Sequence, residues 1–378
     1  MGNPLDIVIR GDGITGCALA LALAPLGLRL GMVGSPAPSQ NSPDVRAYSL
    51  NASARQLLQG LSAWPDAAHT AEVRRIAVWG DGGGEIGFEA QPGQALSWIV
   101  DVPALESLLR ERVRALPDLQ FLNEPVAAPL TVVCEGRASV TRRDWGIEFD
   151  RQPYDQHALA FRVWHEQAHQ SCARQWFGGA GERSSILALL PLADAHTSAV
   201  VWSQPSALAQ QRLDQSDTDL MRALALAMGN ALGDLRLIST RALWPLQSAQ
   251  ARQWSGRWAD GQSFVLVGDA AHTIHPLAGL GLNLGLDDVV VLSQVLSQGL
   301  ARGSSAGVGD SALLRQYERQ RKLGVGMVNA VCDGLQLLFS HPSGLARWAR
   351  NTGLNQVDRL DFLKRWVMAR ATHLETGL

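Results

Sequence analysis

Charge is scarce in this chain of 378 residues. Charged residues make up 18% of it, and only two of them, Lys322 and Lys364, are lysines; typical soluble proteins carry about 25%. The 33 basic and 35 acidic residues nearly cancel, which leaves a formal net charge of -2. A near-neutral chain offers no electrostatic surface for phosphate backbones, so we expect no nucleic acid partner.

Cysteines and long apolar runs are also few. Cys17, Cys134, Cys172 and Cys332 lie far apart and form no CxxC pair, which is typical of a reducing compartment rather than of a disulfide framework. No apolar run reaches the roughly 18 residues of a membrane span, and no basic segment precedes the first apolar stretch as in a secretory signal. We therefore expect a cytoplasmic globular protein with two or three domains.

A βαβ unit is predicted at the N-terminus. Asp6–Ile9 is a short apolar run of the kind found in strands buried on both faces. Cys17–Leu26 is rich in alanine and leucine and ends at Gly27, which predicts a helix, and Leu28–Val33 predicts a second strand. Strand, glycine-rich turn, helix and strand in this order are the setting in which a GxGxxG turn binds a dinucleotide.

The glycines of this turn have separate expected roles. Gly11 permits the tight turn, Gly13 lets the backbone approach a pyrophosphate, and Gly16 lets the helix pack on the strand. The free N–H groups of the helix N-terminus then face the phosphate charge. An acidic residue that would bind the adenosine ribose is missing, because Gly34 and Ser35 end the second strand. A turn with only a structural role is the alternative interpretation.

A second constellation follows the apolar run Ser263–Val267. This predicted strand delivers Asp269 to a turn, where a carboxylate can accept hydrogen bonds from a sugar-alcohol chain. Two glycines, Gly279 and Gly281, then open the N-terminus of a predicted helix, Gly281–Leu296, to a ring with partial negative charge. A capped helix after a surface turn is the alternative, but it explains only one Asp and one Gly of the series.

Further strands and helices are predicted along the chain. Strands are predicted over Val73–Trp79, Leu130–Cys134 and Ala158–Trp164, and two strands of one antiparallel layer over Ile186–Leu192 and Ala199–Trp202. Helices are predicted over Ala104–Leu116 and from Ser311 onward.

The motifs resemble those of a known family. In chain order, Gly11–Gly16, Glu135–Ser139 and Gly268–Gly285 are similar to the three fingerprints of the single-component FAD-dependent aromatic hydroxylases, which share the para-hydroxybenzoate hydroxylase-like fold. Within that family the chain most resembles the ubiquinone-biosynthesis hydroxylases. Similar segments between and after the fingerprints extend the resemblance over nearly the whole chain: Asp44–Leu50, Tyr154–Phe177, Leu190–Leu192, Val201–Trp202, Trp244–Leu246 and Tyr317–Arg321.

The resemblance implies an α/β fold. It comprises a Rossmann-like FAD-binding domain, a second, mostly antiparallel β-sheet substrate domain and a C-terminal helical region. The implied boundaries are 1–72, 98–150 and 258–330 for the FAD-binding domain, 73–97 and 151–257 for the substrate domain, and 331–378 for the helical region.

The resemblance also implies a reaction. NAD(P)H transiently reduces FAD, and the reduced flavin uses dioxygen to hydroxylate an electron-rich ring, here a polyprenylated phenol of ubiquinone biosynthesis. The protein positions the cofactor and the substrate, excludes water from between them and provides the electrostatic environment. It implies no metal ligand, and we assign no catalytic base. The residues implied to contact FAD are Gly11, Gly13, Ile14, Thr15, Gly16, Gly34, Ser35, Arg46, Glu106, Glu135, Gly136, Asp269, Pro276, Gly279, Leu280, Gly281, Leu282 and Asn283.

Some of these positions depart from the family pattern. Gly34 replaces the acidic ribose ligand, Pro103 an arginine, Glu106 and Leu280 two glutamines, and Glu135 an aspartate. Losing a charged acceptor costs about 1.5–3 kcal/mol. The departures predict a protein that purifies largely without FAD and takes it up reversibly, with tighter binding in Gly34→Glu.

Other functions compete with this one. A flavin halogenase or reductase of the same fold is disfavoured because no lysine precedes Lys322 and no WxWxIP segment is present. A degenerate homologue that acts as a non-catalytic scaffold in a biosynthetic complex is the second hypothesis. His165 and His169 form a literal HExxH, but zinc hydrolysis needs a helix and a third ligand, and a strand is predicted just before them.

Basic and apolar residues interleave over Leu345–Leu374. An ordinary pair of packed helices is one interpretation. A peripheral surface for a membrane or a partner is the other, because a polyprenylated substrate resides in lipid. The sequence predicts no oligomeric state.

Overall fold

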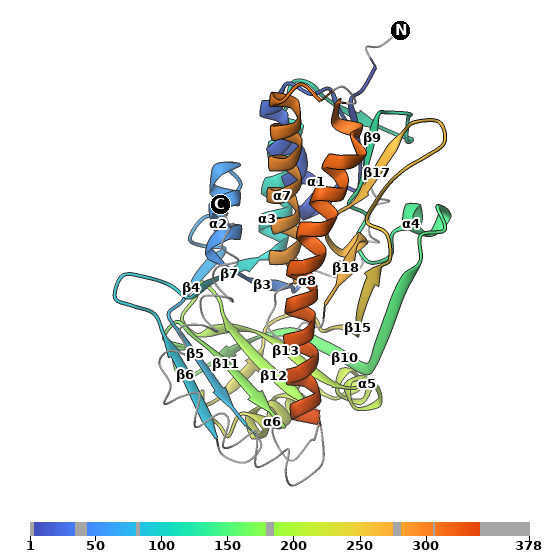
Figure 1. Ribbon diagram of the computed structural model, residues 1–378. Helices are drawn as coiled ribbons and strands as arrows, with labels where there is room; N and C mark the ends of the chain where they lie inside the picture. The colour runs from blue at the N-terminus through green and yellow to red at the C-terminus, as the bar shows by residue number, and fades with distance from the viewer. Residues whose placement is uncertain are drawn as a thin grey trace.

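The computed structural model of the protein describes residues 4–34, 44–80, 84–178, 185–274, 281–304 and 307–340 (Figure 1). One layer is a six-stranded sheet in the order β16-β17-β9-β1-β2-β8, in which only the β16–β17 pair is antiparallel. Its strands are β1 (Ile7–Arg10), β2 (Leu30–Val33), β8 (Leu119–Leu122), β9 (Leu130–Val133), β16 (Ser255–Arg257) and β17 (Ser263–Leu266).

Three helices pack together on this sheet. The helix α1 (Ile14–Leu23) contacts both α3 (Val102–Arg114) and α7 (Gly281–Ala301), and all three share one apolar core with the strands (Figure 1). The N-terminal βαβ unit is confirmed. Its helix ends earlier than expected, because Pro25 lies in a short 3₁₀ turn, Ala24–Leu26, that Gly27 closes at φ 69°.

A second, larger sheet is mostly antiparallel. Its order is β18-β15-β10-β13-β12-β11-β5-β6, with β14 paired to β10, and only the β11–β5 pair is parallel. Its strands are β5 (Arg75–Trp79), β6 (Glu85–Glu89), β10 (Phe149–His165), β11 (Cys172–Phe177), β12 (Ile186–Pro191), β13 (Thr197–Pro205), β14 (Leu235–Leu237), β15 (Ala242–Ala251) and β18 (His272–Thr273).

The two faces of this sheet differ in side-chain size. One face carries large apolar residues such as Phe161 and Trp202, which pack against α6 (Asp217–Ala227) in a second core. The short helix α5 (Ser206–Asp214) follows β13. The other face turns toward the six-stranded layer, and small side chains dominate its middle strands.

A three-stranded sheet lies between the two larger ones. It consists of β3 (Ala47–Leu50), β7 (Ser97–Asp101) and β4 (Thr70–Val73), in that order. Its residues Ala47, Val73 and Ile99 pack on Ala199 of β13. Two short helices, α2 (Ala52–Gly60) and α4 (Val140–Asp144), follow β3 and β9 along the chain.

The long helix α8 (Ser311–Ser340) joins the layers. Leu314 and Tyr317 are buried in the core of the six-stranded layer, whereas Val328 packs on Phe177 and Ile186 of the larger sheet. Figure 1 shows this helix running from one layer to the other. Among the described residues, no helix is both long and apolar enough to cross a bilayer. The expected basic segment after residue 344 lies outside them, and the division into domains stays a prediction.

Candidate active site

The first fingerprint forms a cradle in which only glycine fits. A Cβ on Gly16 would overlap the Gly11 carbonyl oxygen, and a Cβ on Gly11, which adopts φ +108°, would overlap the Cys134 backbone. Thr15 on the first turn of α1 lies against Gly268 and Gly285, so that the first and third fingerprints are in contact. Gly13 differs from the others, because no atom lies within 4 Å of its Cβ position.

This cradle fits the pyrophosphate of a dinucleotide. Gly13 is the N-cap of α1, and neither a side-chain cap nor an acidic residue in the first turn competes for its N–H groups. These free donors and the helix dipole favour a phosphate group beside the open side of Gly13. The residues present therefore suit FAD at this position.

A buried carboxylate holds the third fingerprint. Asp288 of α7 is fully buried and accepts hydrogen bonds from Gly268 N (2.8 Å), His272 Nε2 (2.7 Å) and Arg321 Nε (2.6 Å). Burial opposes ionisation, but the hydrogen-bonded partners His272 and Arg321 lower the pKa of Asp288. We name these four residues the Asp288 network. It fixes the turn that presents Asp269.

The sequence reasoning missed this network. The available signal was a pair of adjacent carboxylates, Asp287 and Asp288, on a helix that is otherwise almost entirely apolar. A charge on the buried side of such a helix requires partners. Asp287 has poorer ones: Ser53 Oγ lies 3.3 Å from Oδ1, and the buried Oδ2 has no hydrogen-bond partner among the described residues. Burial raises the pKa of Asp287 to about 6.

The acidic residue of the second fingerprint, Glu135, stabilises the backbone of its own segment by hydrogen bonds. Glu135 accepts hydrogen bonds from Ser139 Oγ (2.7 Å), Thr141 N (2.9 Å) and Arg10 Nε (3.2 Å). Burial opposes ionisation, but the bonds from Thr141 and Ser139 lower the pKa of Glu135. Buried Arg142 donates to the carbonyls of Ala270 (2.8 Å) and Arg137 (2.9 Å), and so ties the second fingerprint to the third.

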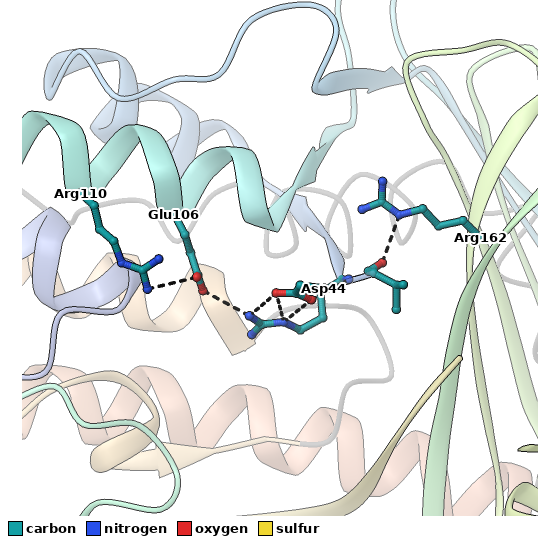
Figure 2. A network of polar contacts seen from close by, with 6 residues as sticks. Asp44, Glu106, Arg110 and Arg162 are labelled. Atoms are coloured by element: carbon teal, nitrogen blue, oxygen red, sulfur yellow. Dashed lines mark hydrogen bonds and ion pairs between the residues drawn. The ribbon is translucent and has the colours of Figure 1, made fainter. Parts of the chain in front are cut away.

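Arg46 lies in a cluster of half-buried charges that Figure 2 shows from close by. Its guanidinium bonds Asp44 (Nε to Oδ2, 2.9 Å), and Nη2 lies 3.2 Å from Glu106 Oε1 on α3, which also pairs with Arg110 at 3.3 Å. We name these four residues the Arg46 network. Burial alone would lower the pKa of Arg46, but the hydrogen bond to Asp44 raises it.

Asp269 faces open space near this network. Its side chain is exposed, yet the surrounding protein raises the pKa of its carboxyl by desolvation, and the charges of Arg137 and Arg46 oppose that rise. Solvent reaches the Asp269 carboxyl although protein atoms lie close around it, and we expect FAD in the space between it and the glycine cradle. Asp269, Arg46 and Arg137 are therefore within electrostatic reach of one another across the space beside the glycine cradle.

A floor of small side chains lies on the larger sheet. In paired strands, opposite residues point to the same face, and the registers place these residues opposite the α6 core: Ala158, Ala160, Ala188, Val201 and Ala242. We name this set the small-residue floor. Two contacts join the strands of this sheet to the cofactor segments: Arg137 Nη1 donates to Pro245 O (3.2 Å), and Arg162 Nε donates to Val45 O (3.4 Å), as Figure 2 shows.

The remaining expected FAD residues have mixed positions. Asn283 uses both ends of its amide internally, accepting from Asn51 N and donating to Ser49 O at 2.8 Å each, which leaves its backbone to contact a cofactor. Ile14 is buried, and Gly281 and Leu282 begin α7. Gly136 adopts φ 72° in the second fingerprint. Four expected residues, Ser35, Pro276, Gly279 and Leu280, lie outside the described residues. All these assignments stay predictions.

The HExxH histidines do not share a helix face. His165 ends β10, with Nδ1 2.7 Å from Gln167 O and Nε2 2.9 Å from Ser198 Oγ. His169 uses Nε2 for the carbonyls of Leu192 and Asp194 and accepts from Ser171 N at Nδ1. Their ring nitrogens are thus occupied by hydrogen bonds that stabilise a corner of the larger sheet.

Comparisons with known proteins agree with this geometry. A sequence profile of the family described as FAD binding domain matches residues 122–329. The 3-demethoxyubiquinol 3-hydroxylase of Escherichia coli (strain K12) is 30% identical over 401 residues, which cover 98% of this chain and 99% of that protein. The chain belongs to this family of FAD-dependent hydroxylases.

Other members support the same assignment. Ubiquinone hydroxylase UbiL of Rhodospirillum rubrum is 28% identical, over 97% of this chain and 89% of that protein. The crystal structure of p-nitrophenol 4-monooxygenase PnpA from Pseudomonas putida DLL-E4 superposes with a TM-score of 0.75 over 100% of both chains at 16% identity, which shows the shared fold. This family member is thus an FAD-dependent monooxygenase, and the expected fold, cofactor and enzyme class are confirmed.

Proposed function

We propose that this monooxygenase hydroxylates the ring of a lipid-tailed phenol in ubiquinone biosynthesis. The reaction transfers one oxygen atom of dioxygen to a ring carbon and releases the other as water, with two electrons from NAD(P)H. The small-residue floor beside the cofactor cleft carries the proposal, and the names of the sequence relatives point to the same class of substrate.

The cofactor fits the fingerprints described above. Gly11, Gly13 and the N-terminus of α1 would hold the pyrophosphate, and Asp269 would accept hydrogen bonds from the sugar-alcohol chain. When bound, FAD takes electrons from NAD(P)H and activates dioxygen. The role of the chain's own residues is to position the two reactants and to exclude water between them.

The floor suits a flat ring with an apolar tail. The alanine and valine side chains are small, and Val201, Ala188 and Ala242 are partly accessible, whereas Ala158 and Ala160 are buried. Trp244, opposite Ala158 in the register, lies on the same face and supplies an aromatic edge. Burial of an apolar tail on such a surface contributes about 25 cal/mol per Å². We therefore expect tailed phenols to bind more tightly than the bare ring.

A steady-state assay tests the proposal. Oxygen uptake with NADH or NADPH is measured for phenols with and without a prenyl tail, together with the hydroxylated product. Ala242→Phe, at a partly accessible floor position, should raise KM for the tailed phenol at least tenfold, whereas Ala231→Phe, at an exposed position outside the floor, should not. Equal KM values for tailed and bare phenols in all three proteins would refute the assignment of the floor.

A further inference from the structure

The end of β2 lacks the acidic side chain that would bind the adenosine ribose. Gly34 occupies that position, and its φ lies outside the left-handed region. Its backbone conformation is therefore open to residues with a side chain. Another feature of the site must account for glycine here.

The carboxylate of Asp12 lies in van der Waals contact with the place where a side chain at position 34 would begin. Among the described residues, and apart from its chain neighbours, the atoms within 4 Å of a Cβ built on Gly34 are Asp12 Oδ2 at 3.5 Å and Asp12 Cγ at 3.6 Å. Asp12 comes from the glycine turn after β1, the parallel neighbour of β2. Both residues therefore lie at the carboxyl end of the sheet, where dinucleotides bind in this class of fold.

The backbone holds Asp12 firmly in this place. Its carbonyl oxygen accepts a hydrogen bond from Cys17 Sγ at 3.1 Å, and Gly11 N donates to Val33 O at 2.9 Å, which links the turn to the end of β2.

We propose that Asp12 binds the adenosine ribose hydroxyls of FAD, in place of an acid at position 34. This inference rests on the FAD cofactor but not on the identity of the phenol. The acidic side chain thus lies on the glycine turn after β1 instead of at the end of β2, and glycine at position 34 places no side chain against it. The expectation that Gly34→Glu tightens FAD is accordingly reversed, because a second carboxylate would lie against the first.

Titrations of the apoprotein test the proposal without enzyme turnover. Binding of FAD is followed by flavin fluorescence in the wild type, in Asp12→Ala and in Asp12→Asn. We expect both variants to bind FAD about ten- to hundredfold more weakly. FMN, which lacks the adenosine half, is the matched control and should bind all three proteins equally.

Displacement of FAD by nucleotides locates the effect on the ribose. ADP should bind the wild type more tightly than 2′-deoxy-ADP does, and this preference should disappear in Asp12→Ala. Gly34→Glu alone should weaken FAD, whereas the double variant Asp12→Gly/Gly34→Glu should recover most of the wild-type affinity.

Three results would overturn the proposal: unchanged FAD affinity in Asp12→Ala, an equal loss for FMN, or tighter FAD in Gly34→Glu alone. Normal FAD binding by the wild type without oxidation of any phenol would instead contradict the proposed function, and it would leave the role of Asp12 standing.

Discussion

The Asp288 network and the Arg46 network both surround the cofactor cleft, but they differ in burial. Asp288 and Arg321 are almost fully buried, and both carboxylate oxygens of Asp288 have donors. In the Arg46 network, the side chains of Arg46 and Asp44 are 34% and 29% exposed (Figure 2). Water does not reach the charges of Asp288 and Arg321, whereas it reaches those of Arg46 and Asp44 and can take the place of either partner.

This difference separates structural charges from adaptable ones. A buried ion pair that loses one partner leaves an uncompensated charge in a low-dielectric interior. A half-exposed pair contributes about 1 kcal/mol or less. The Asp288 network therefore fixes the shape of the third fingerprint, and the Arg46 network can release its arginine to an anionic ligand at little cost.

The largest expected effect is that of Asp288→Asn. Removing its charge leaves buried Arg321 without its hydrogen-bonded counter-charge, so the free energy of unfolding should fall by about 3–5 kcal/mol. Asp44→Asn in the Arg46 network is the matched control and should change it by about 1 kcal/mol or less. Urea unfolding of the three proteins measures both values. Equal losses in the two variants would contradict the distinction between the networks.

Asp269→Ala tests the expected FAD ligand on the turn that the Asp288 network holds in place. Each charge-assisted hydrogen bond to a ligand is worth about 1.5–3 kcal/mol, and we expect this variant to lose its flavin during gel filtration while its unfolding curve stays near that of the wild type. The flavin absorbance of the eluted protein is the measurement. Asp260→Ala, at an exposed turn, should retain flavin. A variant at position 269 that elutes as yellow as the wild type would refute the assignment.

Asp287 sharpens the comparison because it is buried beside Asp288 without comparable partners. Its pKa is raised to about 6, so its protonated form stabilises the fold below about pH 4 and this contribution is lost as pH rises through 6. Asp287→Asn should therefore stabilise the protein at pH 7–8 by on the order of 2 kcal/mol, with the gain vanishing toward pH 4. Unfolding free energies between pH 4 and 8 test this sign. A pH-independent difference would show that the carboxyl does not titrate in this range.

The smallest expected effect is that of Glu106→Gln. This change removes a carboxylate that competes with phosphate for Arg46, so FAD should bind about two- to fivefold more tightly. Glu111→Gln, at an exposed position on the same helix, is the control. Flavin fluorescence titration measures both. Weaker FAD binding in Glu106→Gln would mean that Glu106 itself supports the cofactor.

Much of the fold was predictable because its signals are local. The antiparallel pairing of β12 with β13 is confirmed, as are the helix α7 and the first βαβ unit. The run expected as one strand over Val73–Trp79 divides at Arg74, because β4 pairs in the three-stranded sheet and β5 in the larger one. The alternation of side chains predicts extended backbone, but it does not predict which sheet an extended segment joins.

The length of β10 was also not predictable. Only Ala158–Trp164 has the expected pattern, whereas the strand begins at Phe149. Its first half is polar and exposed, and the register with β15 shifts between Pro153 and His157. Pairing with another strand determines this half of β10, and its own apolar pattern does not.

The sequence by itself determined the glycine cradle and the cofactor class. The contact that excludes a side chain at Gly16 arises within one turn, from the Gly11 carbonyl, and the positive φ of Gly11 belongs to the backbone of the same turn. Only the tertiary structure decided which charges support that cradle. Asp12 and Gly34 meet at the ends of two adjacent strands. Asp288 of α7 meets Arg321 of α8, which lies 33 positions further along the chain. Electrostatic partners of this kind depend on distance in space, and the local spacing of residues carries no record of it.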